Sequence, residues 1–226
     1  MYSQIDRIIF PNLCEVYQIT SHQYVYLIFK NASSLLRKKQ KQHNWKTFIN
    51  EQIKKINEIE IYLREPYERY VSGIETYVYE ELIINPKLNF LTLVEIATKY
   101  LFLDRHFCPQ YYWLCNLARY TKKECKFLIK PLNEINKIVD NDFFDPMDSL
   151  QDELRKKLDL VPQLPKLKKG PQLDKFLNLD RIIIKDFMNK AVTIREINKN
   201  FKTNYSELYK DIFMSGNEVA NQHGMS

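Results

Sequence analysis

The sequence predicts an α/β fold, in which a small parallel sheet is flanked by helices and followed by a largely helical C-terminal part. Two observations predict the sheet: residues 24–39 and residues 59–74 each follow the order strand, loop, helix, the repeating unit of parallel sheets. A third observation concerns size, because 226 residues, of which 45% are hydrophobic, are enough for a packed core. We therefore expect residues 1–226 to form a single domain.

The first unit begins with Tyr24–Phe29, a run of six aliphatic and aromatic residues that predicts a buried strand. The polar loop Lys30–Ser34 follows, and residues 35–39 open a helix. A helix that follows a parallel strand directs unpaired N–H groups and the positive end of its dipole at the mouth of the sheet, where anions bind. The chain has four glycines and no glycine-rich phosphate motif, so a phosphate here would be held by Lys30, main-chain amides and the two loop serines. The alternative is a buried strand followed by an ordinary serine-capped helix.

The second unit begins at residues 59–63, where apolar and polar residues alternate as in a strand. A proline at position 66 then predicts a helix start, since the first helical N–H has no partner in any case. Arg64 therefore stands at the carboxyl end of the second strand, the edge where open parallel sheets bind ligands. The alternative for Arg64 is a surface ion pair with Glu65 or Glu68, which contributes little.

The remaining chain predicts further elements from weaker signals. These are an edge strand near residues 45–49, a third strand at 126–129, a helix near 134–138 and two or three helices within 173–213. The proline-rich stretch 141–172 predicts a long loop, and residues 217–226 predict a polar tail.

Charge and hydropathy limit the classes of partner. The net charge of +6 comes partly from local clusters of lysine and arginine, which are usually solvated faces, so we expect no nucleic-acid partner. No apolar segment approaches the roughly 20 residues that span a bilayer, and residues 1–6 lack the pattern of a secretory signal. We therefore expect a soluble, intracellular chain without membrane insertion.

Four cysteines, Cys14, Cys108, Cys115 and Cys125, form no CxxC pair and predict reduced thiols. Together with His106, the last three could be imagined as a zinc site, but their spacing fits no established zinc pattern. We expect no metal.

Two segments together carry a resemblance to a known family. Phe29–Ser34 reads F-K-N-A-S-S and Arg64–Ser72 reads R-E-P-Y-E-R-Y-V-S. They resemble the sulfotransferases that use 3′-phosphoadenosine 5′-phosphosulfate (PAPS), most closely the Golgi-type carbohydrate sulfotransferases. That family has P-K-x-x-S-[ST] in the first loop and R-[DE]-P-[FY]-E-R-x-x-S in the second, and the second motif matches at every stated position.

Two more segments are similar to this family. Asp104–Gln110 looks like its N-R-H-W-x-P-Q segment, and Tyr205–Phe213 is similar to its C-terminal Y-x-x-D-x-x-x-F region with shortened spacing. The chain differs at Phe29, where the family usually has proline, and it shows no membrane anchor.

The resemblance implies a P-loop-like nucleotide-binding fold and assigns roles to individual residues. Lys30 would contact the bridging oxygen and the sulfuryl group of PAPS, and Arg64 and Ser72 would hold the 3′-phosphate. The 5′-phosphate would be held by the amides of Asn31, Ala32, Ser33 and Ser34 and by the two serine hydroxyls. The product would be adenosine 3′,5′-bisphosphate.

The acceptor hydroxyl, which the resemblance implies is on a carbohydrate, needs a general base. His106 is the histidine that lies in a recognisable segment, and an imidazole titrates in the useful range. The alternative for His106 is a structural histidine that is hydrogen-bonded near Asp104. In that case Glu75 or Glu68 could be the base instead.

Two other functions stay open at this point. A nucleotide-dependent kinase of related topology would normally show a glycine-rich loop, which is absent. A non-catalytic anion-binding protein that kept the fold has no distinguishing sequence feature.

Overall fold

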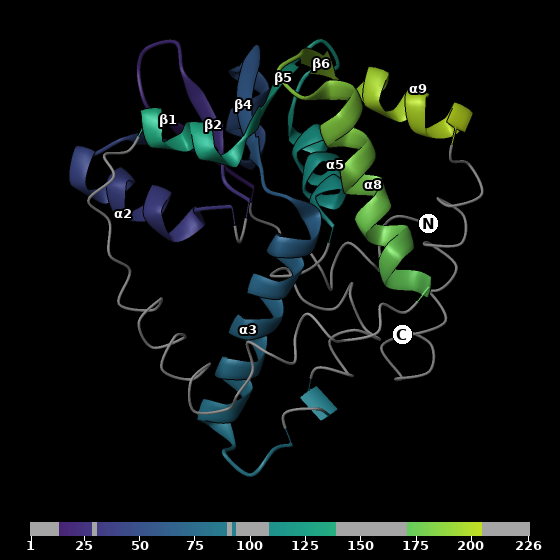
Figure 1. Cartoon of the computed structure of the whole chain (residues 1–226). Coiled ribbons are helices and arrows are strands. Elements are labelled where there is room, and N and C mark those ends of the chain that lie inside the picture. Colours follow the sequence, from purple (N-terminus) through teal and green to yellow (C-terminus); the bar gives the residue numbers. More distant parts are fainter. Residues whose placement is uncertain (1–13, 29–30, 90–91, 94–108, 139–170, 205–226) are drawn as a thin grey trace.

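The computed structural model describes residues 14–28, 31–89, 92–93, 109–138 and 171–204. In this part the chain is an α/β protein with a six-stranded mixed sheet and helices on both of its faces (Figure 1). The strands are β1 (Glu15–Gln18), β2 (Tyr24–Tyr26), β3 (Lys46–Ile49), β4 (Glu58–Leu63), β5 (Lys126–Pro131) and β6 (Ala191–Thr193). The helices are α2 (Ser33–His43), α3 (Pro66–Ile84), α5 (Gln110–Tyr120), α8 (Pro171–Phe187) and α9 (Ile194–Asn204), with 3₁₀ turns η1 (Asn50–Lys55) and η2 (Leu132–Lys137).

The strand order is β3-β1-β2-β4-β5-β6. Its centre, β2, β4 and β5, is parallel, and the two strand–loop–helix units predict this for β2 and β4. The sheet as a whole is mixed and larger than the small parallel sheet that the sequence predicts, because β1, β3 and β6 pair antiparallel with their neighbours. The chain reverses between β1 and β2 in a short turn closed by the Ile19 N–H on the Gln23 carbonyl at 2.9 Å, and a turn that short joins antiparallel strands.

Individual elements follow the sequence patterns to different degrees. The predicted edge strand near 45–49 is β3, and Pro66 is the first residue of α3, as expected. β6 lies within a stretch that predicts helices alone, and the predicted helix near 134–138 is the 3₁₀ turn η2. The predicted loop 141–172 lies outside the described residues up to position 170, and the tail 217–226 lies wholly outside them.

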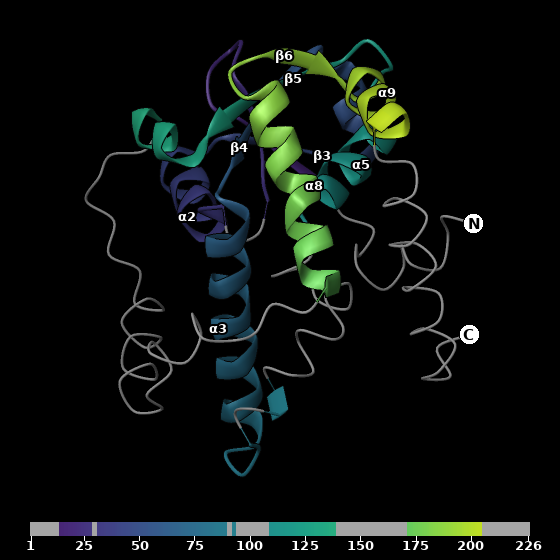
Figure 2. The same ribbon diagram turned by 45° about the vertical axis from the view of Figure 1, so that its right-hand side comes forward.

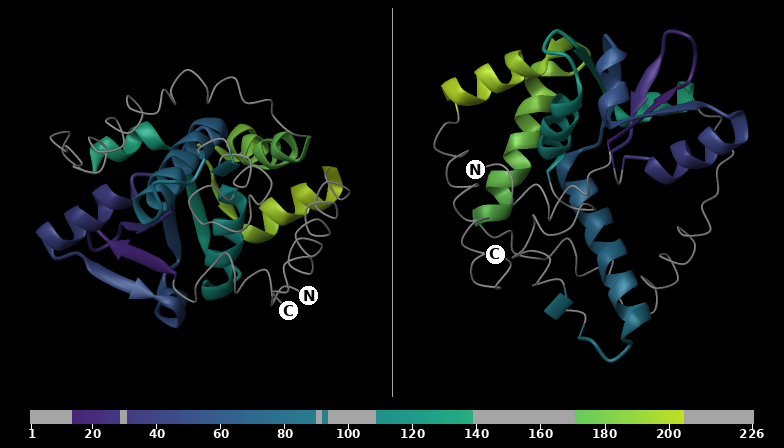
Figure 3. Two further views of the ribbon diagram at one scale, coloured as in Figure 1. Left: turned by 90° about the horizontal axis from the view of Figure 1, so that it is seen from below. Right: turned by 180° about the vertical axis from the view of Figure 1, so that it is seen from behind.

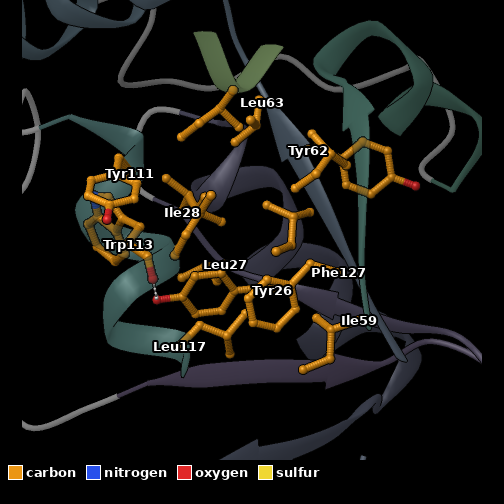
Figure 4. Close-up of a cluster of buried hydrophobic side chains, with 14 of the residues drawn as sticks. Tyr26, Leu27, Ile28, Ile59, Tyr62, Leu63, Tyr111, Trp113, Leu117 and Phe127 are labelled. Atoms are coloured by element: carbon orange, nitrogen blue, oxygen red, sulfur yellow. Dashed lines mark hydrogen bonds between the residues drawn. The ribbon is translucent and has the colours of Figure 1, made fainter. Parts of the chain in front are cut away.

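The core lies between the sheet and α5, α3 and α8. Tyr26 of β2 packs against Trp113 of α5, with ring centroids 6.4 Å apart, and the Tyr26 hydroxyl donates to the Trp113 carbonyl at 3.2 Å, as Figure 4 shows. Ile59 and Phe127 complete this buried face from β4 and β5. Apolar burial on this scale is the main stabilising contribution to such a fold.

Helix α2 lies on the opposite face of the sheet. Arg37 of α2 pairs with Glu15 of β1 at 3.4 Å, and Glu15 points away from the face that carries Tyr26, since side chains alternate along a strand. The start of α3 consequently lies between α2 and α8, at the end of β4 (Figure 2). From there α3 runs away from the sheet (Figures 1 and 3).

None of the described helices is both long enough and apolar enough to cross a bilayer. This holds for α3 as well, although it has 19 residues.

Candidate functional site

A pocket of about 740 Å³ opens at the carboxyl end of the parallel strands. The starts of α2 and α3, the end of β4, the turn η2 and one side of α8 line it. Ala32 of the first predicted loop and Arg64 of the second are both lining residues, together with Arg181 and Lys185 of α8. The pocket therefore lies at the edge of the sheet where the sequence places ligand binding.

The first loop ends in an unusual main-chain conformation. Ala32, directly before α2, is left-handed with φ 57° and ψ 29°, which costs a residue with a Cβ about 1–3 kcal/mol. No side chain within the described part of the chain caps α2. The predicted serine cap is therefore absent in this structure, and the N–H groups of the first turn, beginning at the buried Ser33 and the exposed Ser34, have no partner inside the helix.

Asn31 points into the protein rather than into the pocket. It is 2% exposed, and its side-chain amide donates to the Tyr62 carbonyl at 2.7 Å and to Oε1 of Gln110 at 2.6 Å. Its main-chain N–H donates to the Ile28 carbonyl at 3.1 Å. In this structure the side chain of Asn31 holds the loop in place, and its main-chain N–H already has an acceptor within the protein.

Arg64 stands at the end of β4, as predicted. Its Nε lies 3.6 Å from Oε2 of Glu68, which is the ion pair that the alternative interpretation expects. Nearby, Nε of Arg181 lies 3.9 Å from Oε1 of Glu65. Both pairs are partly exposed, and exposed pairs of this kind typically contribute less than about 1 kcal/mol, so a phosphate group could displace them.

Ser72 does not line the pocket. It lies two turns into α3, half-buried, and its carbonyl accepts a hydrogen bond from the Thr76 hydroxyl at 3.2 Å. The structure thus brings Ala32 and Arg64 together and leaves Ser72 apart from them. Of the alternative bases, Glu68 lines the pocket and Glu75 is buried within α3.

Two buried residues outside the predicted set connect these elements. Gln110, the first residue of α5, contacts both Asn31 and the main chain of Arg64. Asp180 of α8 accepts hydrogen bonds from the N–H groups of Gln110 and Tyr111 at 2.8 and 2.9 Å. Burial raises the pKa of Asp180, and these N–H groups and the charge of Arg69 act in the opposite direction.

A signal for each of these two residues exists in the sequence. Gln110 ends the segment that resembles the family's N-R-H-W-x-P-Q. Asp180 falls three residues after Leu177 and three before Ile183, both of which are buried, so it lies on the apolar stripe of α8. A carboxylate on such a stripe predicts a buried partner.

Lys30, His106 and Cys108 lie outside the described residues. Cys14 and Cys125 are buried free cysteines, as predicted, and burial raises the pKa of the Cys14 thiol to about 12. Among the described residues, no group of three or more His, Cys, Asp or Glu side chains is arranged to hold a metal ion.

Comparisons with protein-family models, with curated proteins and with solved structures find no match to this chain.

Proposed function

We propose that this chain is a sulfotransferase, which moves a sulfuryl group from PAPS to an acceptor hydroxyl on a carbohydrate. The two motif segments support this proposal, since each lies where a parallel strand gives way to the helix that follows it and extends into that helix.

The observation that carries the proposal is that both segments contribute to one pocket. Ala32 comes from the first segment and Arg64 from the second, and both line the same cavity at the carboxyl edge of the sheet. A nucleotide that carries phosphate on both the 3′ and the 5′ oxygen of its ribose needs two anion sites at a short, fixed separation. The start of α2 supplies N–H groups for one phosphate, and the guanidinium of Arg64 suits the other.

The pocket fits a nucleotide in size and in chemistry. Its volume of about 740 Å³ lies within the range of about 300–1,000 Å³ that is typical of small-molecule sites. Leu35, Leu132 and Ile135 supply apolar walls for a base, and Arg64, Arg181 and Lys185 supply positive charge. Glu65 and Glu68 also line the pocket, so the cations exchange a carboxylate partner for a phosphate when a nucleotide binds.

PAPS supplies the sulfuryl group, and the protein's own residues would then act as follows. Lys30 would stabilise the negative charge that grows on the bridging oxygen, and His106 would take the proton from the acceptor hydroxyl. The acceptor oxygen then forms the new bond to sulfur as the bond from sulfur to the bridging oxygen breaks. Arg64 would hold the nucleotide at its 3′-phosphate throughout.

Calorimetric titration of the wild-type protein with adenosine 3′,5′-bisphosphate, adenosine 5′-monophosphate and ATP tests the proposal. We expect the bisphosphate to bind at least about tenfold more tightly than the monophosphate, because a hydrogen bond to a charged group contributes about 1.5–3 kcal/mol. ATP, which lacks the 3′-phosphate, is expected to bind no better than the monophosphate.

Two results would contradict the proposal. Preference for ATP would favour a kinase. Equal binding of all three nucleotides, or binding of none of them, would show that the protein has no site for a 3′-phosphate.

A further inference from the structure

The side chain of Gln110 uses its full hydrogen-bonding capacity. Its Oε1 accepts from Nδ2 of Asn31 at 2.6 Å and from the main-chain N–H of Arg64 at 3.0 Å. Its Nε2 donates to the Arg64 carbonyl at 2.9 Å and to Oδ2 of Asp180 at 3.4 Å. A primary amide offers two lone pairs and two hydrogens, so these four contacts saturate it.

Main-chain groups fix the orientation of both amides in this cluster. The Tyr62 carbonyl can only accept, so Asn31 must direct its Nδ2 toward Tyr62 and Gln110. Gln110 must then present Oε1 to Asn31 and to the Arg64 N–H, and Nε2 to the Arg64 carbonyl. If the Gln110 amide were turned over, its Nε2 would face two donors and its Oε1 would face two acceptors. The hydrogen bonds therefore define one orientation of this side chain.

The Gln110 side chain thereby pairs with Arg64 as a neighbouring strand would, through both main-chain groups. Asp180 holds Gln110 in turn, since its carboxylate binds the Gln110 main chain as well as the side-chain amide. Gln110 is 0% exposed and Asp180 is 3% exposed. In such a buried setting a polar group that loses its hydrogen-bond partner is costly, so the side chains of Gln110 and Asp180 resist displacement.

We infer that Gln110 is a positioning residue that fixes the distance between the first loop, through Asn31, and the start of the second, through Arg64. This inference rests on the proposed function, because Gln110 would affect binding by holding two anion sites at one separation. A ligand with a phosphate in each site depends on that separation, and a ligand with one phosphate does not. Glutamate lacks the two donors that this position requires, asparagine is one methylene shorter, and methionine supplies neither donor nor acceptor of comparable strength.

The test is Gln110→Met, which keeps the approximate volume and removes all four contacts. We expect two results: amide hydrogen exchange at Arg64, followed by NMR, speeds up at least about tenfold, and the affinity for adenosine 3′,5′-bisphosphate falls more than that for adenosine 5′-monophosphate. Gln23→Met is the matched control, because the Gln23 side chain donates one hydrogen bond at 3.0 Å to Glu60 of β4, the strand that ends just before Arg64. This control should change neither quantity.

Gln110→Asn provides a second variant should Gln110→Met fail to fold. It keeps a primary amide with two donors and an acceptor but is one methylene shorter, so it cannot reach all four partners at once and its effect on the affinity ratio should be intermediate.

Unchanged exchange at Arg64 in folded Gln110→Met would overturn the positioning role, whatever the protein binds. An equal loss of affinity for both nucleotides would also overturn it. Absence of a bisphosphate preference in the wild type would instead overturn the proposed function, and with it the role of Gln110 in binding, while the exchange measurement would still show whether Gln110 holds Arg64.

Discussion

Replacing Arg64 with alanine is expected to weaken binding of adenosine 3′,5′-bisphosphate by about ten- to a hundredfold, and to leave adenosine 5′-monophosphate almost unaffected. The physical reason is that a guanidinium forms a two-pronged, charge-assisted contact with a phosphate, and at this partly exposed position we expect the contact as a whole to contribute about as much as one hydrogen bond to a charged group, about 1.5–3 kcal/mol. Arg64 lines the pocket, and its present partner is Glu68 at 3.6 Å, which a phosphate replaces. Titration calorimetry with the two nucleotides measures the effect.

Arg64→Lys should fall between the wild type and the alanine variant, since an ammonium keeps the charge but loses the fork of two donors. The matched control is Arg195→Ala, because Arg195 is exposed on α9 and does not line the pocket. An equal loss of affinity for both nucleotides in Arg64→Ala would argue against a 3′-phosphate contact.

Asp180→Ala is expected to lower the free energy of unfolding by about 3–5 kcal/mol, the usual cost of removing one partner from a buried charged group. The change leaves the N–H groups of Gln110 and Tyr111 without their acceptor and removes the negative charge that faces Arg69. Arg69 is itself 2% exposed. Urea denaturation followed by circular dichroism measures the loss.

Asp186→Ala is the matched control on the same helix. Asp186 is half-buried and its carboxylate accepts one hydrogen bond, from Asn200 at 3.0 Å, so its removal should cost about 1 kcal/mol. A similar small loss in Asp180→Ala would show that the buried carboxylate contributes little to the fold.

The parallel centre of the sheet could be predicted from the sequence because its signals are local. The apolar run from Tyr24 and the alternation at 59–63 each identify a strand without any information about distant residues. Pro66 fixes the start of α3 for an equally local reason. The placement of Arg64 at the carboxyl end of β4 follows directly from these two signals.

The remaining features depend on distant partners. β6 has three residues, and it exists as a strand because it pairs with β5, a contact that no local pattern encodes. The contact between Asp180 and Gln110 spans 70 positions. The expected serine cap of α2 fails for a geometric reason, since the cap position falls on Ala32, whose side chain has no hydrogen-bonding group.

The most direct test of the central claim, that both motif segments hold one nucleotide, is a crystal structure with bound adenosine 3′,5′-bisphosphate. We expect its 5′-phosphate at the N terminus of α2, within hydrogen-bond distance of the Ser33 N–H, and its 3′-phosphate on the guanidinium of Arg64. A nucleotide bound outside this pocket, or bound within it with the 3′-phosphate directed away from Arg64, would contradict the account.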